Sequence, residues 1–264
     1  MINSYLKWAG GKNKMLGNLL PILEEYRKEC FVEPFFGAGN VSLNFQADKY
    51  IVNDLNRDLI NSHKEVQTNT DTYIEFCEEL FSTGHTHYYE NREMFNSLKD
   101  GTFKAALFQY LNKHGFNGLC RYNSKGVYNV PIGTVKKKPT IVPVDKIKNF
   151  ADKFKYVAFF SESYEKFMDV GNSLIYCDPP YVPMGASDFK YTEKGFDFLE
   201  QQKLKYLAKE SKQTVVISNH WNDITQELYK DADRIEVFDV QRTISCKGKE
   251  RIKVKECVVV YNGQ

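Results

Sequence analysis

The chain has 264 residues, of which 42% are hydrophobic, so it has enough apolar side chains for a substantial core in one or two domains. Its six cysteines form no C-x-x-C pair and no paired spacing, which argues against a zinc site or a disulfide framework and favours reduced thiols in a cytoplasm. No run of 18 apolar residues and no signal-peptide pattern occurs, so we expect a protein that is neither secreted nor membrane-spanning.

The net charge is only +2, but the charged residues are unevenly distributed. Residues 101–144 contain seven Lys or Arg and no Asp or Glu, and residues 242–255 contain six basic residues and the single acid Glu250. Because solvated surfaces usually mix the two signs, these stretches favour a polyanionic partner.

The first predicted unit is a strand, a glycine turn and a helix. The pattern predicts a strand at residues 30–36 and an amphipathic helix at residues 40–45, with Gly37 and Gly39 between them. Glycines at this place let a ligand approach the backbone at the start of the helix, although many α/β proteins have such turns for packing alone. Ser42 stands where a dinucleotide fold needs a third Gly or Ala, which disfavours NAD.

A second strand is predicted for residues 50–53, and Asp54 follows it. A carboxylate at this place can accept hydrogen bonds from ribose hydroxyls; the alternative is a helix N-cap. Residues 57–112 have apolar spacings of three and four and are predicted to be mostly helical. Residues 115–143 lose that spacing and are rich in Gly, Asn, Pro and basic residues, which predicts a structured loop with short strands.

Strand signals return in the second half of the chain, with one helix among them at residues 199–211. Strands that alternate with helices indicate an α/β fold with a mostly parallel sheet, here interrupted by a mainly helical insert. The last two strands, joined by the second basic stretch, fit an antiparallel hairpin at the edge of the sheet. The strands predicted in this half cover residues 156–160, 173–177, 214–218, 234–240 and 254–261.

The most informative pattern for chemistry is Asp178-Pro179-Pro180-Tyr181, directly after the buried strand predicted at residues 173–177. Because prolines cannot continue a sheet ladder, the chain must leave the sheet in a stiff turn. The turn offers a carboxylate, a backbone carbonyl and an aromatic ring. This set can accept both hydrogens of a planar amino group, such as N6 of a flipped adenine, and stack on its ring. The alternative is an ordinary strand-ending turn.

The segment from Lys7 to Lys12 places a Trp, two glycines and two cations within six residues. It is either a mobile terminus or part of a binding site, and a Trp is seldom left exposed. The order of the motifs resembles that of Dam-type DNA adenine-N6 methyltransferases, the D12 class with the alpha motif order. These motifs are the segment from Lys7 to Lys12, residues 32–39, Asp54 and the Asp178 turn. Other segments also resemble that family, so that the resemblance covers nearly all of residues 5–262. The segments that resemble its GATC-reading part are 112–123 and 129–133.

The resemblance implies a Rossmann-like class I methyltransferase fold. The catalytic domain would comprise residues 1–56 and 145–264, and an inserted target-recognition domain would comprise residues 57–144. The implied reaction moves a methyl group from S-adenosyl-L-methionine to N6 of a flipped adenine in duplex DNA, within GATC, without a metal. The implied partner is double-stranded DNA and not a membrane. We also expect a monomer in the cytoplasm of a bacterial cell, encoded by the host or by a phage.

The resemblance also implies site residues. The flipped adenine would be held by Asp178, the carbonyl of Pro179 and Tyr181. The residues expected at the cofactor are Trp8, Lys12, Phe35, Gly37, Gly39, Asp54 and Asp178. Those expected at the DNA are Lys7 and Arg121 reading guanines, Leu119 and Pro131 on thymine methyls, Phe116 inserted into the stack, Asn117, Asn123, and Lys136, Lys137 and Lys138 on phosphates.

The sequence departs from the family at two places that concern the position of the DNA. Phe116 replaces a usual Tyr, and Thr134 stands where relatives often carry a basic residue.

Three other interpretations use the same residues. An N4-cytosine or RNA methyltransferase could use the same turn, but Asp178 and the segment 112–133 disfavour it. A non-enzymatic DNA-binding protein with a relict cofactor pocket is disfavoured because every motif position is filled. Cys177 could be a nucleophile of the cytosine-C5 type; since direct transfer to an amine needs no covalent intermediate, a small core residue is the favoured interpretation.

Overall fold

The computed structural model describes the chain except residues 9, 135–139, 183–195, 244–250 and 264, and the chain forms two compact units. Unit 1 consists of Met1–Gly11, Gly37–Leu43 and Asn56–Ser161, and unit 2 of Lys12–Phe36, Asn44–Leu55 and Glu162–Gln264. Predicted site residues occur in both units. The functional division at residues 57 and 144 stays a prediction.

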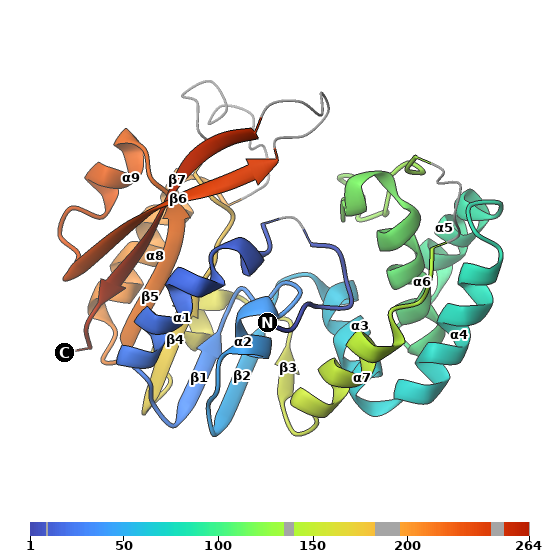
Figure 1. Ribbon diagram of the computed structural model, residues 1–264, viewed down its shortest axis with the longest axis horizontal. Helices are drawn as coiled ribbons and strands as arrows, with labels where there is room; N and C mark the ends of the chain where they lie inside the picture. Colours follow the sequence, from blue (N-terminus) through green and yellow to red (C-terminus); the bar gives the residue numbers. More distant parts are fainter. Residues whose placement is uncertain (9, 135–139, 183–195, 244–250, 264) are drawn as a thin grey trace. The chain divides into compact units, whose positions relative to one another are not determined.

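The described residues of unit 2 form six strands, which lie in the order β2-β1-β4-β5-β7-β6 (Figure 1). The pairings from β2 to β5 are parallel, and β7 is antiparallel to both β5 and β6. The predicted mostly parallel sheet with an antiparallel C-terminal hairpin is therefore confirmed. The strands are β1 (Cys30–Glu33), β2 (Lys49–Asn53), β4 (Ser173–Cys177), β5 (Thr214–His220), β6 (Arg234–Thr243) and β7 (Arg251–Tyr261).

The middle strands of this sheet are buried along their length. Every residue of β1 and of β4 is buried, as expected for parallel strands that are covered on both faces. Helix α8 packs against β5. The helices of unit 2 are η1 (Lys12–Lys14), α1 (Leu16–Glu25), η3 (Tyr164–Phe167), α8 (Phe198–Glu210) and α9 (Asp223–Leu228).

The order of the strands determines where a ligand can bind in unit 2. Strand β1 lies between β2 and β4, so the sheet continues from β1 to β2 on one side, and β4 is added later in the chain on the other side. In open α/β sheets this switch point, at the carboxyl ends of the strands, is where ligands bind. The residues that follow these three ends include Phe35, Asp54 and Asp178.

Unit 1 is mainly helical, as predicted for residues 57–112. Its elements are most of α2 (Asn40–Asn44), α3 (Arg57–Thr68), α4 (Thr70–Ser82), α5 (Tyr88–Ser97), α6 (Thr102–His114), η2 (Phe116–Gly118), α7 (Val144–Lys153) and β3 (Ala158–Phe160).

Three separate segments of unit 1 meet at His63 in α3. Its Nε2 donates to the carbonyl of Gly37 at 2.8 Å, and its Nδ1 accepts from the hydroxyl of Tyr5 at 2.9 Å. The ring has no exposed surface, and burial lowers the pKa of His63 to about 4. A neutral histidine therefore ties the N-terminal segment and the glycine turn to α3.

The structure corrects two expectations and excludes one alternative. The strand predicted for residues 30–36 ends at Glu33, because Pro34 has no N–H for the ladder. Asp54 is not a helix N-cap: Asn56 caps α3 by accepting the N–H of Leu59 at 3.1 Å. Within residues 115–143, the described part contains η2 and two isolated bridges in place of short strands.

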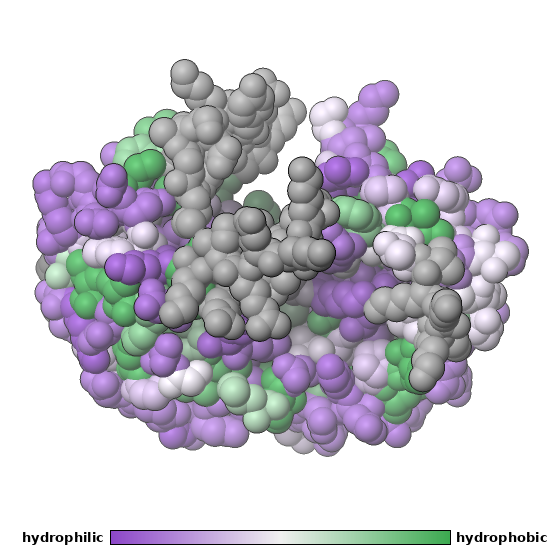
Figure 2. Space-filling view, turned by 45° about the horizontal axis from the view of Figure 1, so that its top comes forward, coloured by the Kyte–Doolittle hydropathy of each residue, from purple (hydrophilic) through white to green (hydrophobic). Residues whose placement is uncertain are grey.

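The described surface on the face shown in Figure 2 is mostly hydrophilic, with its hydrophobic residues in small separate groups. Within the described part of the chain, none of the helices is both long enough and apolar enough to cross a membrane.

Candidate active site

The turn after β4 brings a carboxylate, a cation and an aromatic ring together in unit 2. The side chain of Asp178 is 19% exposed, and its Oδ1 lies 2.6 Å from Nζ of Lys12, a residue with only 4% exposure. The same Nζ lies 4.5 Å from the centre of the Tyr181 ring. We expected Lys12 at the cofactor; the structure places its ammonium group against two of the three predicted catalytic residues.

A polar network fixes the backbone of this turn. The carbonyl of Pro180 accepts from Nε2 of Gln201 at 2.7 Å, and the N–H of Val182 donates to Oδ1 of Asn219 at 3.0 Å. Asn219 in turn donates to Gln201 at 3.0 Å. Both amides are buried, so the stiffness predicted from the prolines is reinforced by α8 and β5.

Tyr181 is held by two residues that the motif did not predict. Its hydroxyl donates to Oε2 of Glu256 at 3.1 Å, and its ring packs edge-on against His220 with 4.8 Å between centres. His220 and Glu256 face each other across the β5–β7 ladder. Glu256 follows a basic stretch of the sequence, and only the register of the β5–β7 pairing shows that it belongs to the site. No sequence pattern therefore indicated Glu256 as a site residue.

The other predicted cofactor residues of unit 2 lie where β1 and β2 end. Phe35 packs against Tyr164 with 5.0 Å between ring centres, and Asp54 is half-buried after β2. Asn53 fastens this region by donating from one amide nitrogen to the carbonyls of Pro34 and Glu162, each at 3.0 Å. The ends of β2, β1 and β4 thus present two carboxylates and an aromatic ring, a set suited to a nucleoside-containing ligand.

Unit 1 carries the remaining cofactor residues, Trp8, Gly37 and Gly39. Gly37 and Gly39 have φ angles of 53° and 73°, which favour glycine. The indole of Trp8 lies so close that a Cβ on Gly37 would stand 2.9 Å from Nε1. The structure therefore brings Trp8 onto the turn in which sequence reasoning placed the cofactor contact.

Lys7 is clamped to the end of α6 in unit 1. Asn112 accepts from the N–H of Lys7 at 2.8 Å and donates to its carbonyl at 2.7 Å. The ammonium group of Lys7 donates to the carbonyl of Lys113 at 3.1 Å, at the carbonyl end of the helix. A Cβ on Gly118, whose φ is 67°, would meet Cβ of Lys7 at 2.8 Å. The sequence pattern did not predict this clamp.

Most other predicted DNA residues lie on or beside residues 119–129, a segment with an exposed tip at residues 123–127, which we call the reading hairpin after its predicted role. Its arms are joined by the N–H of Asn129 to Arg121 O at 3.1 Å and that of Asn123 to Val127 O at 2.9 Å. Arg121 is exposed, and its guanidinium donates to Oδ1 and O of Asn129 at 2.8 and 3.2 Å.

The remaining predicted DNA residues are mostly exposed. Phe116 has 38% exposure, and Asn117 and Pro131 are also exposed. Lys136, Lys137 and Lys138 lie outside the described residues. Thr134, one of the two departures from the family, is exposed as well.

Cys177 is not placed for a nucleophilic role. It is fully buried within β4, and burial raises the pKa of its thiol well above the usual range. The interpretation as a core residue is therefore confirmed. Among the described residues, no group of three or more His, Cys, Asp or Glu is arranged to hold a metal ion.

The mostly parallel sheet, with β7 inserted antiparallel between β5 and β6 and an acidic D-P-P-Y turn after β4, defines a class I methyltransferase. Residues 8–244 match the family described as D12 class N6 adenine-specific DNA methyltransferase, and the chain belongs to this family.

The relatives that it resembles include three bacterial proteins, each named DNA adenine methylase. The one from Escherichia coli (strain K12) is 40% identical over 268 residues, covering 98% of this chain and 95% of the relative. That of Haemophilus influenzae (strain Rd) is 38% identical over 272 residues, covering 98% and 94%. That of Vibrio cholerae is 38% identical over 269 residues, covering 98% and 95%.

Proposed function

We propose that this protein transfers the methyl group of S-adenosyl-L-methionine to N6 of an adenine flipped out of duplex DNA, within the sequence GATC. The observation that carries the proposal is the Asp178 turn, where a carboxylate and an aromatic ring stand at the switch point of the sheet. That the substrate is adenine in DNA is supported by the family to which the chain belongs. The choice of GATC rests on the similarity of residues 112–133 to the segment with which Dam-type enzymes read that sequence.

The residues at the strand ends fit a nucleoside-containing methyl donor. Asp54 would accept hydrogen bonds from the ribose hydroxyls, and Phe35 and Trp8 would cover the apolar surfaces of the cofactor. The side of Gly37 that a Cβ would occupy is taken by the indole of Trp8, so at this turn Trp8 would present its ring to the cofactor. Gly39, which also has a positive φ, would let a ligand lie close to the backbone. When bound, S-adenosyl-L-methionine supplies a methyl group that its sulfonium already activates.

The role of the protein in the reaction is to activate the amino nitrogen N6 of adenine, which is a poor nucleophile. The N6 lone pair of adenine is delocalised into the ring. Hydrogen bonds from the amino group to the carboxylate of Asp178 and the carbonyl of Pro179 favour a pyramidal nitrogen and offset its developing positive charge. We assign Lys12 the role of counter-ion, which holds the carboxylate of Asp178 in place. Because the turn is held by Gln201 and Asn219, these acceptors are oriented before the base arrives.

Extruding the adenine from the helix costs a few kcal/mol. Stacking of the base on Tyr181 would return about 1–3 kcal/mol of this. The bond from Tyr181 to Glu256 would hold the ring in one orientation for such stacking.

The test is to compare wild type with Asp178→Ala on duplex DNA that lacks methylated adenine. We expect the variant to lose methyl transfer in single-turnover assays while its DNA affinity stays within about tenfold, because Asp178 binds the amine and not the duplex. Asp152→Ala, which removes an exposed carboxylate of α7, is the control and should keep wild-type turnover.

Two results would overturn the proposal. One is an Asp178→Ala enzyme that keeps more than a few per cent of wild-type turnover. The other is a wild-type enzyme that methylates RNA or cytosine in preference to adenine in DNA. Sequencing the modified positions in plasmid from a methylation-free host would show whether GATC is the target.

A further inference from the structure

The reading hairpin has two faces with different contacts. In an extended segment successive side chains point to opposite faces. By this alternation Leu119, Arg121 and Asn123, which we assign to DNA, would share one face. Arg121 is exposed and bonds to Asn129 in the other arm, and Oδ1 of Asn123 accepts the N–H groups of Lys125 and Val127 in the turn. The other face carries Cys120 and Tyr122, which contact the helical body of unit 1.

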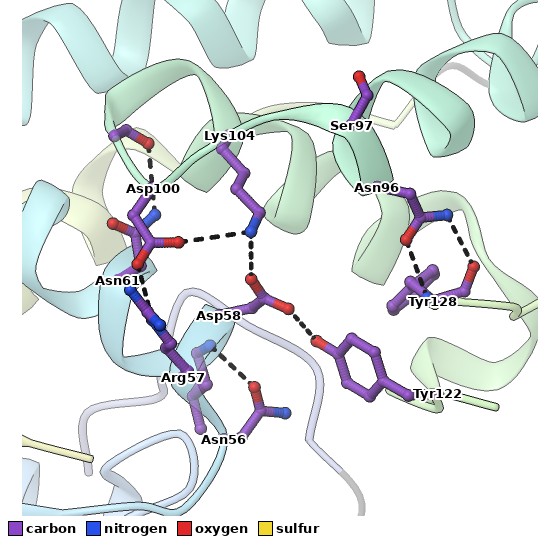
Figure 3. Close-up of polar contacts among 12 residues, drawn as sticks. Asn56, Arg57, Asp58, Asn61, Asn96, Ser97, Asp100, Lys104, Tyr122 and Tyr128 are labelled. Carbon is purple, nitrogen blue, oxygen red and sulfur yellow. Dashed lines mark hydrogen bonds and ion pairs between the residues drawn. The ribbon is translucent and has the colours of Figure 1, made fainter. Parts of the chain in front are cut away.

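Tyr122 and Cys120 are anchored to the first turn of α3. The hydroxyl of Tyr122 donates to Oδ2 of Asp58 at 2.7 Å (Figure 3). Nδ2 of Asn56 lies 3.3 Å from Sγ of Cys120. Burial, followed by the nearby Cys120 and Asp58, raises the pKa of Tyr122, so its hydroxyl stays protonated and able to donate.

Asp58 is itself held by an ion pair. Its Oδ1 lies 2.8 Å from Nζ of Lys104 in α6, and the side chains of the two residues are only 16% and 14% exposed. Lys104 also pairs with Asp100 at 3.4 Å, and Arg57 pairs with Asp100 at 2.9 Å (Figure 3). The four charges sum to zero. The group therefore neither attracts nor repels DNA through net charge, and what it provides is a fixed position for a carboxylate.

The sequence explains why the anchor comes from outside the segment. Residues 101–144 contain no Asp or Glu, so a hairpin suited to a polyanion has no carboxylate of its own for a buried hydroxyl. Asp58 supplies the acceptor from α3 and places the charge on the face away from Arg121.

We propose that Asp58 and Tyr122 are positioning residues for sequence recognition, which hold the reading hairpin so that Arg121 and its neighbours meet the base edges in one orientation. The proposal rests on the proposed function and deepens it. Loss of the anchor should broaden the set of sites that are methylated, while the catalytic turn in unit 2 keeps its contacts. Base contacts, and not backbone contacts, carry sequence information, so misplacing this face affects discrimination first.

The test uses Tyr122→Phe, which removes only the hydroxyl, and measures kcat/KM on GATC duplexes and on all single-base variants of that site. We expect the ratio of GATC to variant sites to fall about tenfold, with cofactor affinity unchanged. Tyr110→Phe is the matched control. It removes another buried hydroxyl of unit 1, one that donates to the carbonyl of Gly84 at 2.6 Å, and should leave the ratio unchanged.

Variants of Asp58 separate the anchor from general destabilisation. Asp58→Asn keeps an acceptor for Tyr122 and should preserve most of the discrimination, whereas Asp58→Ala should lose as much as Tyr122→Phe. The double variant Asp58→Ala/Tyr122→Phe should be no less selective than either single variant, because both remove one interaction.

The outcomes distinguish this inference from the proposed function. If wild type methylates no adenine in DNA, the proposed function fails. If wild type is selective and Tyr122→Phe remains within twofold of it, or loses no more selectivity than Tyr110→Phe, the anchor has no role in recognition and this inference fails alone. Should wild type prefer a sequence other than GATC, the same comparison is made on that sequence, and the same two results support or overturn the role of the anchor.

Discussion

Lys12 and Asp178 show how much one pair of residues contributes to both stability and chemistry. Both charges are mostly removed from water, at 4% and 19% exposure, and are 2.6 Å apart. A pair of this kind adds little net stability compared with an apolar pair, but removing one partner leaves an uncompensated charge. The pair is therefore better explained by the need for a carboxylate in a fixed position at the end of β4 than by folding.

From this we predict that removing both residues of the pair restores stability but not activity. Lys12→Ala should lower the free energy of unfolding by about 3 kcal/mol, the lower end for a broken buried pair, because Asp178 keeps some contact with water. The double variant Lys12→Ala/Asp178→Ala should recover most of this loss, since no unpaired charge remains, yet should transfer no methyl group. Urea unfolding and single-turnover assays measure the two effects. A double variant as unstable as Lys12→Ala would show that the ion pair is not the cause.

At the scale of elements, the N-terminal segment packs directly against the backbone between α6 and the reading hairpin, and this contact fixes the position of Lys7. Gly118 is the clearest case, because its φ of 67° and its contact with Lys7 both require glycine. The chain passes from α6 through η2 while Asn112 holds the N-terminal segment against it.

We predict that Gly118→Ala displaces Lys7 and weakens selection of the target site. The new Cβ would stand 2.8 Å from Cβ and 3.0 Å from Cδ of Lys7, so the lysine must move. Gly126→Ala is the matched control, since Gly126 has a φ of 74° and open space around its Cβ position. Both variants should lose about 1 kcal/mol of stability from backbone strain. Only Gly118→Ala should lose kcat/KM on GATC, by about tenfold or more; equal activity in the two variants would contradict the role of the contact.

The sequence predicted this fold well where local patterns decide it. Unbroken apolar runs and the D-P-P-Y turn located β4 and its exit, and helical spacing predicted a mostly helical stretch at residues 57–112, where α3 to α6 lie. It could not show that Glu256 faces Tyr181 or that Asp58 anchors Tyr122, because these pairs are 75 and 64 residues apart in the chain. Such contacts depend on sheet register and helix packing, which no local pattern encodes. The predicted site residues were consequently the motif residues, and those that hold them in place were missed.

For the molecule as a whole, acid sensitivity should come from buried neutral histidines of unit 1. Burial lowers the pKa of both His63 and His114 to about 4, against a usual value of 6.5. The unfolded chain therefore binds protons at these positions before the folded one does. Stability is complete above pH 6.5 and falls as the pH drops toward 4. At His63 a proton on Nδ1 would also remove the acceptor for Tyr5.

We predict a slope of about 1.4 kcal/mol per pH unit for each of these histidines between pH 6 and pH 4.5, or about 3 kcal/mol each over the whole range. His63→Gln offers a donor for Gly37 and an acceptor for Tyr5 without titrating. In urea unfolding followed from pH 7.5 to 4.5, this variant should show a shallower fall than wild type by one such slope, and His63→Gln/His114→Gln by two. Carboxylates titrate equally in all three proteins, so the differences isolate the histidines. Parallel curves for the three would mean that protonation of these rings does not drive acid unfolding.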